Sequence, residues 1–133
     1  MTDRTETGNT LMGKKIIMVG WHPSVVDYSK YPGLTAEKLE RSLTADVQKL
    51  KDQGYDASIG FIHDGDSGTR QLTELLNENE FDVVMIGAGV RKDDDHFLTF
   101  EKLMNIVHEH APRSRIAFNT GPTDSDAAIK RWA

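Results

Sequence analysis

Four short apolar runs, each followed by a cluster of small, polar or imidazole-bearing residues, constrain the fold of this chain most strongly. The runs cover residues 15–20, 57–62, 81–87 and 115–119, and stretches with helical spacing separate them. The first and third runs are the most continuously apolar, which is typical of strands covered on both faces. Strands that alternate with helices at this spacing predict a parallel sheet with right-handed crossovers.

Helix signals fill the segments between the runs. Thr35 is a suitable N-cap for a helix that Gly54 ends. The expected starts of the next three helices are Asp66 or Ser67, the acidic cluster 93–95, and Asp124. The side chains expected to face the core are Leu39, Leu43, Val47, Leu50, Leu72, Leu75, Leu76, some of Phe97, Phe100, Leu103, Met104 and Val107, and Ala128, Ile129 and Trp132.

Two strand orders are compatible with this pattern. A flavodoxin-like sheet has the order 2-1-3-4, and a Rossmann-like half has 3-2-1 with the fourth strand beyond the first. We favour the first, because it puts the two most apolar strands side by side at the centre. The prediction is a three-layer α/β fold: an open parallel sheet of four strands with helices on both faces. Residues 14–133 form this single domain, and residues 1–13 are expected to be a flexible leader.

Composition excludes several classes of protein. The 16 Lys and Arg residues against 21 Asp and Glu give a formal net charge of -5, which argues against nucleic-acid and anionic-membrane partners. The chain has no cysteine, so disulfides, thiolate catalysis and Cys-ligated metals are excluded. The N-terminal segment lacks the apolar stretch of a signal peptide, and no run reaches the roughly 20 apolar residues of a membrane span. A cytoplasmic protein is therefore expected.

The clusters that follow the four runs indicate where a site lies. Carboxyl ends of parallel strands share one edge of the sheet, and open α/β sheets bind ligands in the crevice at that edge. The clusters are Trp21-His22-Pro23, His63-Asp64-Gly65-Asp66, Gly87-Ala88-Gly89-Val90-Arg91 and Asn119-Thr120-Gly121-Pro122. We expect them to surround a small-molecule ligand.

The segment 21–33 is long for a strand-to-helix connection and contains Trp21 and Tyr31. These aromatic side chains are candidates for stacking on a ligand, the alternative being that they only cap the core. His22 is a candidate general acid–base, the alternative being a surface histidine bonded to its own loop. His96 is expected near Arg91 and across the crevice from His22, which makes it the second catalytic candidate.

The Gly87-to-Arg91 cluster is the most distinctive. Gly87 and Gly89 allow close approach of backbone to ligand, and Arg91 adds a forked cation, a combination suited to a carboxylate, phosphate or carbonyl group. The alternative is an ion pair of Arg91 with Asp93 or Asp94. The cluster lacks the third glycine of a dinucleotide fingerprint and follows the third strand, so no cofactor is indicated.

His63, Asn119 and Thr120 complete the expected ligand contacts, although Asn119 and Thr120 are equally suited to capping the last helix. His63 with Asp64 and Asp66 has donors for a divalent cation. The calcium-loop pattern fails, however, since its required Gly and Glu are replaced by Thr69 and Leu75, and Asp66 fits better as a helix cap. No metal is therefore expected.

The layout resembles flavodoxin-like and response-receiver domains. In place of the receiver's acidic pair after the first strand stand Trp21 and His22, and in place of its phospho-accepting aspartate stands Gly87. The hydroxyl-rich loop that binds flavin phosphate is also missing. The resemblance therefore implies the fold and neither activity.

Two functions remain open from the sequence. The first is a small-molecule binder, extending to a cofactor-independent enzyme that uses histidine acid–base chemistry on an anionic or carbonyl-containing metabolite. It predicts that His22→Ala and Arg91→Ala abolish ligand binding and leave the melting temperature nearly unchanged. The second is a non-catalytic sensor or oligomerisation module that forms a homo-oligomer through the fourth strand or the 21–33 loop.

Overall fold

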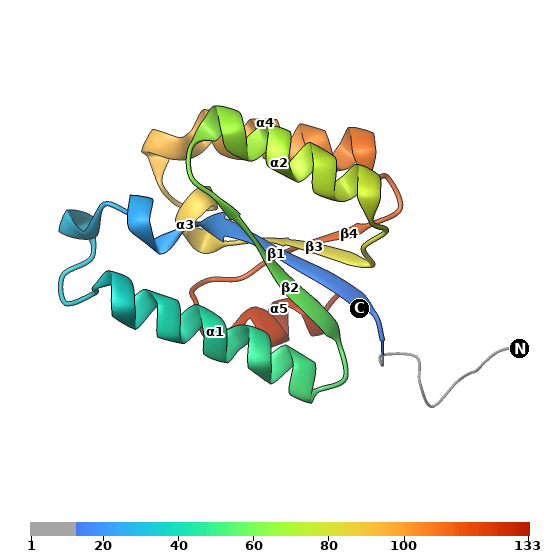
Figure 1. The fold of residues 1–133 in the computed structure, drawn as a ribbon, viewed down its shortest axis with the longest axis horizontal. Helices are drawn as coiled ribbons and strands as arrows, with labels where there is room; N and C mark the ends of the chain where they lie inside the picture. The colour runs from blue at the N-terminus through green and yellow to red at the C-terminus, as the bar shows by residue number, and fades with distance from the viewer. Residues whose placement is uncertain (1–12) are drawn as a thin grey trace, which may run out of the picture.

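A computed structural model describes residues 13–133, so the expected leader lies, apart from Gly13, outside the described residues. Four strands form one all-parallel sheet in the order β2-β1-β3-β4 (Figure 1). The strands are β1 (Lys15–Trp21), β2 (Asp56–Ile62), β3 (Val83–Ile86) and β4 (Arg115–Phe118). The predicted order is confirmed, and the two most apolar strands pair at the centre with Met18 opposite Met85.

Helices cover both faces of the sheet, which gives the predicted three layers. The α-helices are α1 (Ala36–Asp52), α2 (Gly65–Glu78), α3 (Ala88–Arg91), α4 (Phe97–His110) and α5 (Ser125–Lys130). Short 3-10 turns lie at η1 (Pro23–Val25), η2 (Tyr28–Lys30) and η3 (Asp94–His96). Helices α2 and α4 lie on one face, and α1 and α5 on the other (Figure 1).

Alternate residues of the central strand face opposite layers, as strand geometry requires. Ile17 and Val19 pack with the apolar residues of α2 and α4, whereas Ile16 and Met18 pack with those of α1 and α5. The apolar face of α1 contributes Leu50 to the second of these cores. Both faces of β1 are thus buried, which explains its unbroken apolar sequence.

Local signals set the ends of the first helix as expected. Thr35 Oγ1 accepts a hydrogen bond from the Lys38 backbone N–H at 3.2 Å, and Gly54 has φ +97° after the last turn. In α2 the cap differs from the prediction. Asp64, not Asp66, accepts from the Ser67 N–H at 2.7 Å, so α2 begins one residue before Asp66.

Two aromatic side chains near helix ends are exposed: Phe97, one of a group of which only some were expected in the core, and Trp132, which was expected to face inward. Phe97 is 57% exposed because it is the first residue of α4, one turn before the residues that reach the sheet. Trp132 is 50% exposed because α5 ends at Lys130, two residues earlier. The acidic cluster 93–95 also does not begin α4; Asp94 and Asp95 form η3, and the helix follows it.

Gly68 brings α2 close to the second strand. A Cβ atom at this position would lie 2.7 Å from Ile62 Cβ and 2.8 Å from its Cγ2, closer than side chains tolerate. The missing side chain therefore fixes how near α2 lies to β2. Within residues 13–133, no helix is long and apolar enough to cross a membrane.

Asp46 on α1 is buried, at 1% exposure, and neither carboxylate oxygen has a hydrogen-bond partner in the described part of the chain. Burial raises the pKa of Asp46 above its ordinary value of 3.8, an effect that the nearby Ser125 hydroxyl and Lys49 ammonium offset only in part. The folded state therefore holds the Asp46 proton more tightly than the unfolded chain. As pH rises above 3.8, ionisation of this group progressively destabilises the fold.

We predict that the stability of Asp46→Asn relative to the natural chain increases with pH. The difference in free energy of unfolding should rise above pH 3.8 and level off beyond the raised pKa, because the variant has no carboxyl group to ionise. Urea unfolding across this pH range measures the difference. Asp52→Asn, which removes an exposed charge from the same helix, is the matched control. A difference that is flat or falls with pH contradicts the assignment.

Candidate functional site

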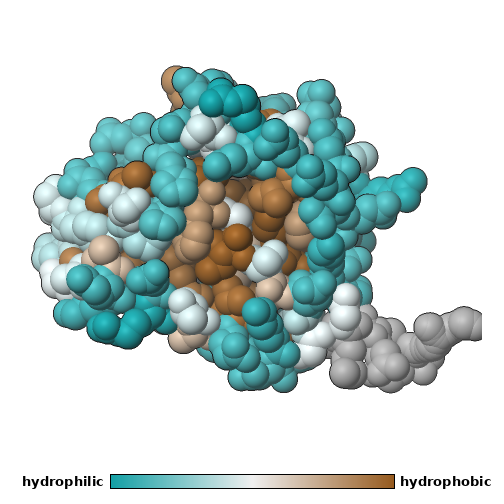
Figure 2. Space-filling model, in the orientation of Figure 1, coloured by the Kyte–Doolittle hydropathy of each residue, from teal (hydrophilic) through white to brown (hydrophobic). Residues whose placement is uncertain are grey.

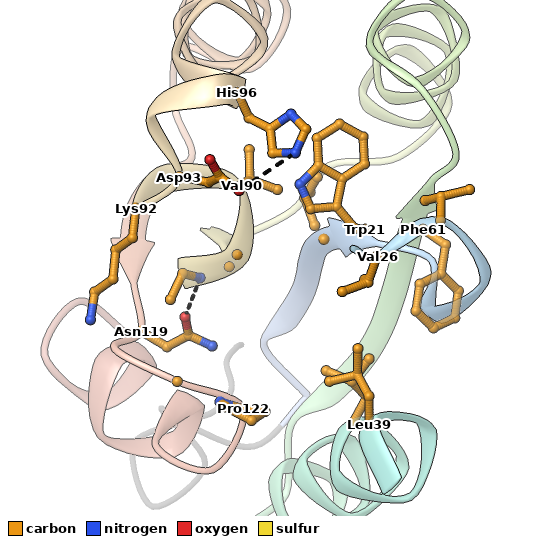
Figure 3. A pocket seen from close by; sticks show the side chains of 18 of the residues that line it. Trp21, Val26, Leu39, Phe61, Val90, Lys92, Asp93, His96, Asn119 and Pro122 are labelled. Atoms are coloured by element: carbon orange, nitrogen blue, oxygen red, sulfur yellow. Dashed lines mark hydrogen bonds and ion pairs between the residues drawn. The ribbon is translucent and has the colours of Figure 1, made fainter. Parts of the chain in front are cut away.

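The carboxyl ends of all four strands border one cavity of about 650 Å³ (Figure 3). The segment 25–34 and the N-terminal half of α1 complete its wall. A volume of this size is typical of small-molecule sites. The predicted gathering of the four clusters at one sheet edge is a direct consequence of the parallel order.

Most of the cavity wall is apolar. The apolar lining comes from β1, β2, β3, α1, α3 and the loops: Met18, Val19, Trp21, Val25, Val26, Leu34, Leu39, Leu43, Ile59, Phe61, Met85 and Val90. On the face that β2 crosses, Figure 2 shows apolar side chains gathered in a hollow with hydrophilic side chains around it. Leu39 projects from α1 toward the cavity (Figure 3).

Trp21 and His96 line the same side of the cavity. Their ring centroids are 4.6 Å apart with an angle of 50° between the planes. The indole Nε1 of Trp21 is buried and has no hydrogen-bond partner among residues 13–133, and a Cβ on Gly89 would lie 3.8 Å from Trp21 Cδ1. The His96 Nε2 lies 3.9 Å from Asp93 Oδ2, the contact drawn in Figure 3. Trp21, Gly89 and His96 thus form one wall.

Lys30 ties the 21–33 loop to η3 beside the cavity. Its Nζ lies 2.8 Å from Asp93 Oδ2 and 2.7 Å from Asp95 Oδ2. The hydrogen bond from Lys30 holds the pKa of Asp93 below its ordinary value, and the two carboxylates raise the pKa of Lys30. Lys30, Tyr31 and Asp93 all line the cavity, so this pairing fixes part of its border.

His22 and His63 stack on each other, with ring centroids 4.6 Å apart and planes 19° apart. The His22 Nδ1 accepts from the Ser24 backbone N–H at 3.1 Å and lies 2.8 Å from Ser24 Oγ. His63 lines the cavity, but His22 does not. The bonding of His22 to its own loop corresponds to the alternative weighed from the sequence. The structure brings His63 and His96, not His22, to the cavity.

Arg91 does not line the cavity either. Its Nη2 donates to the Asn119 carbonyl oxygen at 2.7 Å, and its guanidinium carbon lies 5.4 Å from the centre of the Phe118 ring. The guanidinium thus binds the end of β4. Within residues 13–133, Arg91 forms no ion pair with Asp93 or Asp94. Its contacts therefore match neither the anion-binding role nor the ion pair that the sequence suggested.

Asn119 and Thr120 line the cavity but use their polar atoms within the protein. Asn119 Oδ1 accepts from the Ala88 N–H at 2.8 Å, and its Nδ2 donates to Ser125 Oγ at 3.0 Å. The Thr120 hydroxyl donates to Asp124 Oδ2 at 2.6 Å. Asn119 therefore holds the β3–α3 and β4–α5 connections together, and the Thr120 side chain bonds within the β4–α5 connection.

Gly87 lies close against β1 where β3 meets α3. Its N–H donates to the Val19 carbonyl oxygen at 2.8 Å, and a Cβ at this position would lie 3.3 Å from the same oxygen. The N–H groups of Gly87 and Ala88 are therefore both paired within the protein.

Several lining residues were not identified as site residues from the sequence. The sequence predicts Leu39 and Leu43 on the core face of a helix, because the side chains of a cavity wall and of a core have the same periodicity. Lys30 and its partners are more than 60 residues apart, and no sequence signal connects them. In residues 13–133, no three His, Asp or Glu side chains are grouped closely enough to hold a metal ion.

We predict that Arg91→Ala lowers the free energy of unfolding by about 1–3 kcal/mol, since it leaves a partly buried carbonyl without its charged donor. This replaces the sequence-based expectation of an unchanged melting temperature. Urea denaturation measures the loss, and Arg113→Ala, at an exposed arginine, is the control. Equal stability of the two variants would exclude a structural role for Arg91.

Neither a comparison with protein-family models nor one with curated protein sequences finds a match to this chain. Function is therefore inferred from the geometry of the cavity.

Proposed function

We propose that this protein binds a small organic molecule in the cavity at the carboxyl edge of its sheet. The observation that supports the proposal is a space of about 650 Å³ with a mainly apolar lining, bordered by the ends of all four strands. Protein interiors are close-packed, so a cavity of this size with apolar walls is typical of a ligand site. Its position is the one at which open α/β sheets bind ligands.

Trp21, Tyr31, His63, Gly89 and His96 are the proposed ligand contacts. All five line the cavity, and none of their side chains donates or accepts a hydrogen bond within the described part of the chain. The wall formed by Trp21, Gly89 and His96 offers a flat aromatic surface beside a nitrogen donor or acceptor.

An acid–base role in the proposed site belongs to His96. Its imidazole lines the cavity, and Nε2 lies 3.9 Å from the Asp93 carboxylate. His22 is not proposed as its partner, because the His22 ring contacts His63 and Ser24 instead.

The alternative of an oligomer formed by strand addition at β4 receives less support. The carbonyl oxygen of Phe118 accepts from Arg131 Nη2 at 2.9 Å. This cationic side chain occupies an acceptor that an added strand would need, a common protection of sheet edges.

A metabolite library screened by thermal shift tests the proposal. We predict that at least one compound raises the melting temperature of the natural chain by several degrees, because saturating ligand stabilises the folded state. Leu39→Trp should abolish the shift, since the larger side chain fills the cavity from α1. The matched control is Leu98→Trp, at a position 68% exposed and outside the lining.

The proposal fails if no compound shifts the natural chain, or if the compounds that do so stabilise Leu39→Trp equally. If Leu98→Trp keeps the thermal shift, its loss in Leu39→Trp is due to the filled cavity and not to the addition of a tryptophan.

A further inference from the structure

Resting on the proposed function, we infer that the cavity selects a largely apolar ligand whose polar group is uncharged, such as an alcohol, ketone or aldehyde. Carboxylates and phosphates are not expected among the preferred ligands of the cavity. The apolar floor, the paired cations and the acidic side chains at the border each support this selectivity.

The floor of the cavity favours an apolar ligand body. Met18, Ile59 and Met85 come from three adjacent strands and face α1, and Leu39 and Leu43 of α1 lie opposite them. Each apolar group of a ligand that leaves water for this space contributes favourably, by roughly 25 cal/mol for each Å² buried. A chain or ring system fits these walls better than a strongly hydrated group.

The cations at the border are committed within the protein. Lys30 Nζ is paired with Asp93 and Asp95, and Lys92 Nζ donates to the Thr120 carbonyl oxygen at 3.1 Å. Arg91 is directed to the end of β4 and does not line the cavity. An anionic ligand would therefore have to compete with existing partners for a counter-charge.

The carboxylates at the border act against an anion. The cavity lining contains three carboxylates, those of Asp27, Asp64 and Asp93, and two lysines. It therefore has one more acidic than basic side chain. Hydrogen bonds to Ser29, Ser67 and Lys30 respectively keep the pKa of each carboxyl below its ordinary value, so all three stay ionised at neutral pH. A carboxylate or phosphate would lie among like charges.

The imidazole at the border suits an uncharged oxygen. In residues 13–133 the His96 ring forms no hydrogen bond, and it lines the cavity. An imidazole ring can donate to the oxygen of a ligand carbonyl or hydroxyl group and can accept from a hydroxyl group.

Two fluorescent probes with one common body test the inference. N-phenyl-1-naphthylamine is uncharged, and 8-anilino-1-naphthalenesulfonate adds only a sulfonate. At low salt we predict a Kd at least tenfold lower for the uncharged probe, with both signals reduced by Leu39→Trp. Since the uncharged probe is also more apolar, the effect of charge is isolated with Asp93→Asn. That variant should lower the ratio of the sulfonate Kd to the Kd of the uncharged probe several-fold.

Asp94→Asn is the matched control, because Asp94 neighbours Asp93 but does not line the cavity, and it should alter neither probe. The inference is overturned if the sulfonate binds as tightly as the uncharged probe, if Asp93→Asn and Asp94→Asn act alike, or if probe binding survives Leu39→Trp. The proposed function still stands after such a result when the metabolite library yields a ligand that Leu39→Trp excludes. It fails separately when the library yields none.

Discussion

Parallel pairing of four strands is the constraint on which the rest of this structure depends. It places four carboxyl ends at one edge, while the helices cover the two faces and leave that edge to loops. The apolar side chains of β1 and β3, such as Met18 and Met85, continue the core up to the edge. Leu39 and Leu43 of α1 line the opposite side of this space, so the core ends there in a cavity and not in a sealed layer.

The polar residues at this edge mainly hold the segments of the cavity wall together. Asn119 joins the start of α3 to α5, Arg91 holds the end of β4, and Lys30 ties the first loop to η3. These contacts connect segments that are far apart in the sequence. The result is a frame of polar contacts around an apolar space, an arrangement common in ligand sites.

The sequence predicts the fold well because the fold depends on repeated, local signals. Continuous apolar runs indicate central strands, and Thr35 and Gly54 mark the ends of a helix through their own backbone chemistry. The edge at which the clusters meet follows from strand direction alone.

The direction in which a side chain turns at that edge cannot be predicted in the same way, because it depends on partners elsewhere in the chain. Arg91 and Asn119 have the chemistry of ligand contacts, yet the carbonyl and amide groups that engage them lie about 30 residues away. The same applies to His22, which turns to His63.

An open apolar space at the carboxyl edge of the sheet underlies every functional inference drawn for this protein. Xenon occupies apolar cavities without requiring any specific ligand, so crystals of the protein pressurised with xenon can show whether the space exists. We expect xenon density between Met18, Met85, Leu39 and Leu43. If these side chains instead pack against one another with no xenon among them, the space does not exist in the folded protein.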